Sequence, residues 1–217
     1  MPWTNPETFT AGQTLTAASM NIVSGNARMG GPVFTNEAAR DAAITAPEEG
    51  MTVYLTAPTV PAATGAITAV PTGVRTIYNG SVWVCVTTIG ASSQTSGTTS
   101  SNPHVTTLTG DSTAVSATLV TGTTVFLTMY AQGGNNGAGG ITEFQMTYSV
   151  SGATTVAASE TNGCRHTITG GNQGLEVSMH RMVTGLTAGA NTFTLNYRAP
   201  GGIATYNQRY LTVQGVA

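Results

Sequence analysis

Apolar and polar residues alternate along most of the second half of the chain, which is the pattern of β-strands with one buried and one wet face. Phe193, Leu195 and Tyr197 alternate with polar neighbours near the end of the chain, and the same period of two recurs in several earlier runs. Gly-rich turn clusters separate these runs, and no helical period lies between them. The pattern predicts strands near residues 104–109, 114–120, 123–131, 141–150, 164–169, 175–183, 191–198 and 203–214.

So many short strands within residues 103–217 favour a β-sandwich, and above all a jelly roll. An immunoglobulin-like sandwich is the alternative. It is weakened because the sequence lacks the Cys…Trp…Cys spacing of that fold. The expected fold class is therefore mainly β, with a C-terminal jelly-roll sandwich preceded by a small α+β region.

Residues 1–33 have no pattern that could build a core of their own. Pro2 and Pro6 oppose a helix at the start. A short, weakly amphipathic helix is expected after Thr16, its N-cap, and it stops at the Gly-Gly-Pro of 30–32. A helix of this kind is marginal alone and needs a partner surface. We therefore expect this arm to attach the protein to another copy or to a larger particle through Trp3, Phe9, Met20, Val23 and Ala27.

Residues 34–89 predict a small α+β module. Its pattern gives a helix with Thr35 or Asn36 as cap and Ala43 or Ile44 as end, a strand over 51–55, a long loop over 56–73, and a hairpin of strands 74–78 and 81–88. Asn79-Gly80 supplies the positive φ values that a two-residue hairpin turn needs, and Trp83 anchors the unit.

A run of small polar residues over 90–102 predicts a flexible linker. The expected organisation is an arm with an attachment helix over 1–33, the module over 34–89, the linker over 90–102 and a β-sandwich head over 103–217.

Charged residues make up only 7% of the chain, against about 25% in a typical soluble domain. All seven basic residues are arginines, they are scattered, and the net charge is −2, so the sequence has no electrostatic footprint for nucleic acid. The first residues lack the features of a signal peptide, and no apolar run approaches the ~20 residues of a membrane helix. We expect no nucleic-acid partner and no membrane insertion.

The sequence shows no constellation typical of catalysis. Its carboxylates are few and spread out, Asp111 lies in an ordinary turn context, and no Gly-x-Ser-x-Gly motif is present. Cys164 and His166, with His180 on a later strand, form the only set that resembles metal ligands, and a fourth ligand is not evident. We expect that the protein is not an enzyme and that it binds neither a metal nor a cofactor.

Three segments resemble structural proteins of tailed bacteriophages. The first, from Phe9 to Asn21, contains Gly-Gln-Thr-Leu-Thr-Ala-Ala and is similar to an opening common near the start of phage tail and fibre proteins. The second joins Ala-Ala-Arg-Asp-Ala-Ala-Ile of 38–44, Pro-Glu-Glu-Gly-Met-Thr-Val-Tyr of 47–54 and Tyr-Asn-Gly-Ser-Val-Trp of 78–83, and it resembles a small phage virion module. The third, 185–198 with 210–213, is similar to the last strands of trimeric, tumour-necrosis-factor-like jelly-roll heads on phage fibres. Residues 56–73 depart from the module, because this loop is longer than its pattern has.

The resemblance implies a virion structural protein, which is a trimeric short fibre, spike or adaptor of the tail or capsid. Its N-terminal part would attach to the particle, its head would face outward, and it would assemble in the host cytoplasm. Its partners would be copies of itself, other virion proteins and a host surface glycan. We expect Tyr206 and Tyr210 to help form the trimer contact. Two alternatives stay open: a carbohydrate-binding adhesin head, in which Tyr130, Tyr206 or Tyr210 could stack on sugar rings, and a capsid decoration protein without a receptor role.

Overall fold

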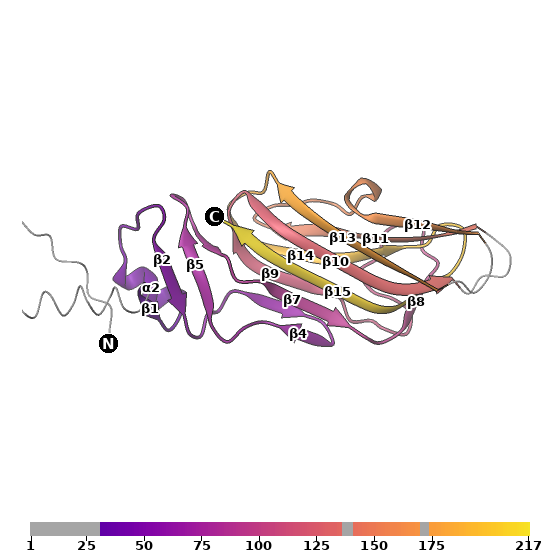
Figure 1. Ribbon diagram of the computed structural model, residues 1–217, viewed down its shortest axis with the longest axis horizontal. Helices are drawn as coiled ribbons and strands as arrows, with labels where there is room; N and C mark the ends of the chain where they lie inside the picture. Colours follow the sequence, from indigo (N-terminus) through magenta and orange to yellow (C-terminus); the bar gives the residue numbers. More distant parts are fainter. Residues whose placement is uncertain (1–30, 136–140, 170–173) are drawn as a thin grey trace, which may run out of the picture.

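The computed structural model describes residues 31–135, 141–169 and 174–217. Figure 1 shows an elongated molecule with a small sheet at one end and a two-layered sandwich beside it. The small sheet has the strand order β1-β2-β5-β6. Its members are β1 (Val33–Phe34), β2 (Thr52–Leu55), β5 (Val74–Tyr78) and β6 (Trp83–Cys85), and helix α2 (Glu37–Ala43) accompanies them. Within the described ranges, no helix has the length and apolar character needed to cross a membrane.

Local sequence signals set the ends of these elements. Asn36 caps α2, because its side-chain oxygen accepts a hydrogen bond at 3.0 Å from the backbone N–H three residues on. The β5–β6 hairpin turns at Asn79 and Gly80, and Gly80 has a φ of 87°, which glycine adopts without strain. Asn79 Oδ1 accepts hydrogen bonds from the N–H groups of Ser81 and Val82 at 3.1 and 3.0 Å. The predicted helix is confirmed, and a hairpin forms at the predicted place. Its strands are connected by the four residues 79–82 instead of the two residues Asn79-Gly80, and β6 is shorter than the run 81–88.

Two sheets form the sandwich. Their strand orders are β13-β10-β15-β7-β4, with β8 paired to β15, and β12-β11-β14-β9-β3. The first sheet consists of β4 (Ile67–Ala69), β7 (Ile89–Ser93), β8 (Gly97–Thr99), β10 (Thr124–Asn135), β13 (Gly174–Thr184) and β15 (Ala204–Val216). The second consists of β3 (Ala62–Thr64), β9 (Ser116–Thr121), β11 (Ile141–Gly152), β12 (Cys164–Thr169) and β14 (Gly189–Arg198), with the 3-10 helix η1 (Glu160–Asn162) before β12.

The strand order is that of a jelly roll. The chain changes sheet at nearly every connection: β9 lies in the second sheet, β10 in the first, β11 and β12 in the second, β13 in the first, β14 in the second and β15 in the first. The resulting layers, β7-β15-β10-β13 over β9-β14-β11-β12, confirm the jelly roll and exclude the immunoglobulin-like alternative. The predicted strands from 114 to 214 are all present. The strand predicted over 104–109 is wrong, because this stretch forms only isolated bridges.

The linker expected over 90–102 is also wrong, because this stretch holds most of β7 and all of β8. β7 is buried at all five positions, and it pairs with β15 on one side and with β4 on the other. Small residues are needed there, since a Cβ on Gly90 would lie 3.2 Å from Thr212 Cγ2 and 3.3 Å from Leu211 O. The loop expected over 56–73 is corrected in the same way, because β3 and β4 within it extend both sheets of the sandwich.

The small sheet and the sandwich share one core. Buried side chains of both belong to a single contiguous cluster, from Val53 of β2 to Leu211 of β15. The two parts also approach closely at the end of β15, where a Cβ on Gly215 would lie only 2.4 Å from Cys85 O of β6. The hydrophobic core is therefore continuous across the expected boundary between the module and the head.

A charged side chain lies inside the sandwich. Arg209 of β15 has no exposed area, and its Nη2 donates hydrogen bonds to Asp111 Oδ2 and, at 3.1 Å, to Thr95 O. Its guanidinium carbon lies 5.5 Å from the centre of the Tyr197 ring. Ser93 of β7 donates to the same carboxylate oxygen at 2.5 Å. The interpretation of Asp111 as an ordinary turn residue misses this ion pair, because Asp111 and Arg209 lie 98 positions apart in the sequence.

The ion pair predicts an acid-sensitive step in stability. Burial alone would raise the pKa of Asp111, but hydrogen bonds from Ser93, Thr113 and Arg209 outweigh it and lower the pKa from 3.8 to about 2. A depressed pKa in the folded state means that this stabilisation is complete above about pH 4 and is lost as the pH falls through about 2. We expect the free energy of unfolding to fall by about 2 kcal/mol across that window, as measured by denaturant titration at fixed pH values.

Asp111→Asn should remove that pH dependence. It also leaves Arg209 buried without its charged partner, which costs about 3–5 kcal/mol at neutral pH. Glu48→Gln, on an exposed turn, is the matched control and should alter neither quantity. An Asp111→Asn protein with the acid profile of the unmodified chain would contradict the assignment.

Candidate functional site

The two tyrosines expected at a trimer contact lie in different places. Tyr206 is fully buried between the sheets, where its ring stacks on Phe144 with centroids 4.1 Å apart. Its hydroxyl donates to Gln145 O at 2.6 Å, and burial raises its pKa. A side chain without exposed area cannot contact another subunit, so the expectation for Tyr206 is wrong. The expected attachment residues Trp3, Phe9, Met20, Val23 and Ala27 lie outside the described residues.

Tyr210 lies on the outward face of the strands β13, β10 and β15, which we call the outer face. Antiparallel pairing places alternate side chains in rows across it, so that Tyr130 stands between Ser178 and Tyr210. The outer face consists of Thr184, Met182, His180, Ser178 and Glu176 of β13, Thr124, Phe126, Thr128, Tyr130 and Gln132 of β10, and Val216, Gln214, Thr212, Tyr210 and Gln208 of β15.

Aromatic contacts order the middle of the outer face. Tyr130 and Tyr210 lie with ring centroids 5.6 Å apart in a tilted arrangement. The His180 ring is nearly parallel to Phe126, with centroids 6.3 Å apart, and its Nδ1 shares a hydrogen bond of 3.0 Å with Thr128 Oγ1. These contacts hold the rings against the sheet and leave flat, amphipathic surfaces toward solvent.

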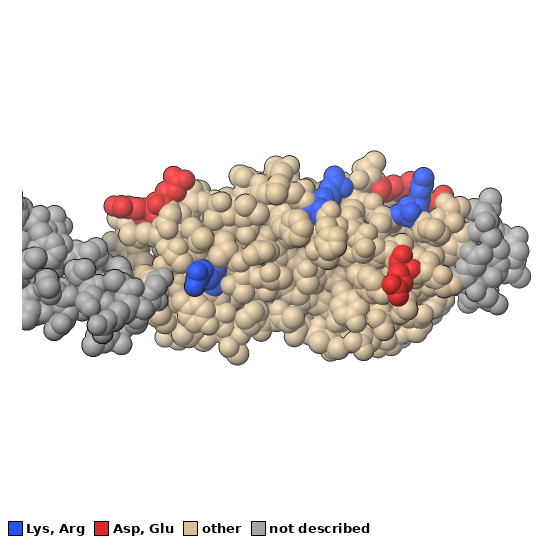
Figure 2. Space-filling view, in the orientation of Figure 1, with Lys and Arg blue, Asp and Glu red and all other residues tan. Residues whose placement is uncertain are grey.

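Apolar side chains remain exposed at one end of the outer face. Phe126 and Met182 face each other across β10 and β13, and Val216 lies in the next row. Glu176 is the only carboxylate among the outer-face residues, and no arginine is among them. Figure 2 shows that charged side chains form only a few separate spots on the face in view, and that most of the described residues on this face are uncharged. Exposed apolar groups on a nearly uncharged face are typical of an interaction surface.

A cleft of about 440 Å³ opens at the other end of the outer face. Gln132 Nε2 donates to Glu176 Oε1 at 3.3 Å, and both residues line the cleft together with Asn207. Burial and the neighbouring Glu176 carboxylate raise the pKa of the Tyr130 hydroxyl. Amide, carboxylate and phenol groups thus lie close together, next to the Tyr130–Tyr210 ring pair. The sequence alone does not reveal this grouping, because it depends on the register of three strands.

The residues considered as metal ligands are distributed over both sheets. Cys164 and His166 belong to β12 of the second sheet, whereas His180 is on β13 of the first and bonds to Thr128. The Cys164 thiol points at Met146 O at 3.6 Å, and burial raises its pKa to about 11. Among the described residues, no group of three or more His, Cys, Asp and Glu side chains is arranged to hold a metal ion.

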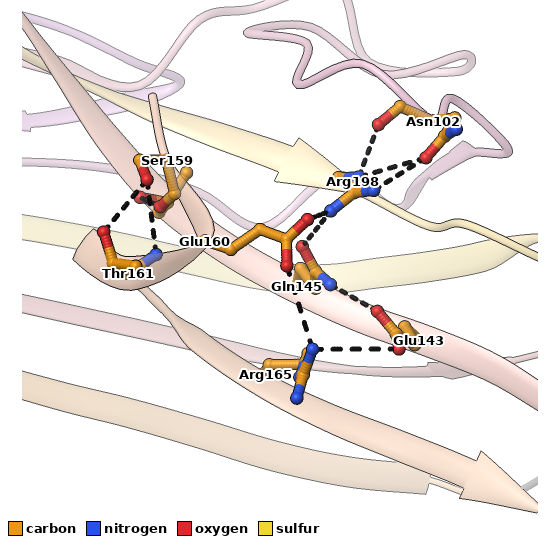
Figure 3. Close-up of polar contacts among 9 residues, drawn as sticks. Asn102, Glu143, Gln145, Ser159, Glu160, Thr161, Arg165 and Arg198 are labelled. Carbon is orange, nitrogen blue, oxygen red and sulfur yellow. Dashed lines mark hydrogen bonds and ion pairs between the residues drawn. The ribbon is translucent and has the colours of Figure 1, made fainter. Parts of the chain in front are cut away.

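The second sheet carries a cluster of charged side chains, which Figure 3 shows with Arg198 between Asn102 and Glu160. Arg198 Nη1 pairs with Glu160 of η1, and its Nη2 donates to Asn102 Oδ1 at 2.8 Å. Arg165 lies 3.8 Å from Glu160 and 3.9 Å from Glu143. Because each carboxylate faces an arginine, the cluster fixes η1 and the loop after β8 to the sheet and offers no free acid–base pair.

Comparisons with known proteins add little to this geometry. No protein-family model matches the chain, and no curated protein matches it in sequence. Solved structures resemble it weakly. Eiger, a tumour necrosis factor from S. frugiperda, is 9% identical with a TM-score of 0.35, over 49% of this chain and 66% of its own. A chain in the structure of infectious bursal disease virus, Gx strain, is 9% identical with a TM-score of 0.33, over 65% of this chain and 40% of its own.

A family 35 carbohydrate-binding module from an environmental isolate is 19% identical with a TM-score of 0.27, over 56% of this chain and 89% of its own. This chain therefore spans about two thirds of Eiger and two fifths of the viral chain. At these TM-scores the likenesses decide neither fold nor function, and the assignment of the jelly roll rests on the strand order.

The charged cluster generates a prediction about order in the second sheet. Arg198→Ala removes the contacts of Glu160 and Asn102 together, so amide hydrogen exchange in residues 153–163 should accelerate at least about tenfold. Arg165→Ala is the matched control. Its side chain is 55% exposed and its ion pairs are long, so it should change exchange little. Equal effects of the two substitutions would show that Arg198 does not hold η1 in place.

Proposed function

We propose that this chain is a structural protein of a phage virion, a homotrimeric fibre, spike or adaptor whose jelly-roll head associates through the outer face. The observation that carries the proposal is the nearly uncharged outer face, where the large apolar side chains of Phe126, Met182 and Val216 are exposed together at one end. Association through this face removes apolar area from water. It desolvates only one carboxylate per subunit, that of Glu176. Of the two tyrosines expected at the contact, only Tyr210 lies on this face.

The position of the protein in a particle is part of the same proposal. The three phage-like segments of the sequence support it, and their order gives an attachment arm over 1–33, a small module and then the head. The arm would bind the tail or capsid, and the head would face outward. The charged cluster around Arg198 also fits a structural role, because its carboxylates are paired with arginines. In this proposal the protein is not an enzyme and needs no cofactor.

A charge placed on the outer face should separate the subunits. Phe126→Glu would bury an unpaired carboxylate in each contact, so we expect the dissociation constant to rise at least 100-fold, equivalent to about 3 kcal/mol. Sedimentation equilibrium or native mass spectrometry of the full chain measures the change. Ile203→Glu is the matched control, because Ile203 is 42% exposed and Phe126 is 43% exposed, and Ile203 lies off the outer face.

Trimers of the unmodified chain that turn into monomers only with Phe126→Glu would support the proposal. A monomeric unmodified chain at micromolar concentration, or trimers that persist in the Phe126→Glu protein, would rule out association through this face.

A carbohydrate-binding adhesin is the second candidate, because the Tyr130–Tyr210 ring pair stands beside the cleft of Gln132, Glu176 and Asn207. Flat rings next to amide and carboxylate groups suit a sugar. In this case Tyr210→Ser should weaken binding of the full chain to a glycan array at least tenfold. The oligomeric state of the protein should stay unchanged. Ser178→Ala, in the same row, is the control. An array on which the unmodified chain binds no glycan would exclude this candidate and leave a decoration role without a receptor.

A further inference from the structure

A cavity of about 300 Å³ lies between helix α2 and the strands β5 and β6 of the small sheet, and Val120 of β9 in the head completes its lining. Arg40 and Asp41 of α2 line the cavity, and so do Tyr78, Ser81 and Trp83 of the hairpin that the sequence predicts. This volume is at the lower end of the range for small-molecule sites in proteins, and it suits a ligand of one ring.

Arg40 supplies hydrogen-bond donors that the fold does not use. Its side chain is buried, with 6% of its area exposed, and its guanidinium lies 4.8 Å from the centre of the Trp83 ring. Nε donates to Asp41 Oδ1 at 2.8 Å. Within the part of the chain that the structure describes, neither Nη1 nor Nη2 has a hydrogen-bond acceptor. Neither nitrogen is among the buried polar atoms that lack a partner within the described residues, so both remain open to solvent and can donate to an oxygen ligand in the cavity.

The carboxylates around the cavity decide the charge of that acceptor. Glu37 also lines the cavity, and it accepts hydrogen bonds from Thr59 N at 2.9 Å, Thr59 Oγ1 at 2.8 Å and Val60 N at 3.0 Å. These bonds lower its pKa against the opposing effect of burial, so Glu37 is ionised at neutral pH. With Asp41, two carboxylates stand against the single guanidinium of Arg40. The net negative charge of the site would repel an anionic ligand, whereas it would not repel a neutral oxygen ligand.

The walls also offer donors and acceptors in close succession. Arg40 donates, the free oxygen of Asp41 accepts, and the hydroxyls of Tyr78 and Ser81 can do both. Neighbouring hydroxyl groups on one ring match such a set, because each hydroxyl donates one hydrogen bond and accepts others. The half-buried Tyr78 ring provides the apolar surface that the C–H face of a sugar ring needs. Trp83 is only 8% exposed and has Arg40 over its ring, so it holds the guanidinium in place.

We propose that this cavity is a binding site for a neutral polyol of monosaccharide size, held by hydrogen bonds to Arg40 and Asp41 and by contact with Tyr78. The site is independent of the proposed virion role, since it requires neither a trimer nor the outer face. It also differs from the cleft on the head, which lies at the other end of the sandwich strands.

The test is ligand-observed NMR with the full chain and three probes at equal millimolar concentration: glucose, N-acetylglucosamine and acetate. We expect at least one sugar to show saturation transfer and acetate to show none. Arg40→Lys keeps the charge but loses the forked donors, and Asp41→Asn loses the acceptor, so each should weaken sugar binding at least tenfold. Arg75→Lys, on an exposed position of β5 outside the cavity, should leave it unchanged.

Several outcomes overturn the proposal. Acetate binding that exceeds sugar binding would make the cavity an anion site, and silence of both sugars would exclude a monosaccharide. Sugar binding that survives Arg40→Lys but disappears with Tyr210→Ser would belong to the head. Ser81→Ala tests the cavity again if Arg40→Lys fails to fold, and unchanged binding in that variant also counts against the proposal. The mass of the assembly that each variant forms shows separately whether the proposed trimer persists.

Discussion

Arg209 in the last strand is the constraint on which the order of the sandwich depends. A guanidinium without exposure is tolerated only when a partner is held beside it. Asp111 is that partner, and it is held in turn by Ser93 of β7 and by the N–H of Thr113, which donates to Asp111 Oδ1 at 2.9 Å. Between β7 and β9 the chain forms only the short strand β8 and isolated bridges, and this stretch brings Asp111 to Arg209.

The sequence predicts the head well because its strands alternate cleanly. Phe193, Leu195 and Tyr197 are all buried, as period two requires. The hairpin turn forms where expected, because the Asn79 side chain accepts two backbone hydrogen bonds and Gly80 adopts a positive φ. The linker prediction fails for a physical reason. Small polar residues are typical of flexible chain, but they also fit a strand such as β7 that is packed closely on both sides, and composition does not separate the two cases.

The candidate sites were harder to anticipate, because they depend on residues far apart in the sequence. Tyr206 and Tyr210 are both strand tyrosines, yet their positions differ by an even number and they still have opposite fates. The register shift between Gln132 and Gly133 of the neighbouring strand accounts for this, because it displaces the pairing of β15 by one residue between them. Likewise, the pairing of Arg40 with Trp83 joins a helix to a hairpin, and no local pattern encodes it.

The place of β7 has a mechanical consequence. Figure 1 shows the small sheet at one end of the molecule and the strands of the sandwich running lengthwise from it. β7 follows the small sheet directly and is bonded along both edges, to β15 and to β4. Part of a pulling force that enters through the small sheet therefore acts along β7 and loads its ladder hydrogen bonds together, in shear. The connection from β2 to β3 and the shared core carry the rest. A flexible tether would let the head swivel, whereas a strand embedded in a sheet transmits both tension and torque to it.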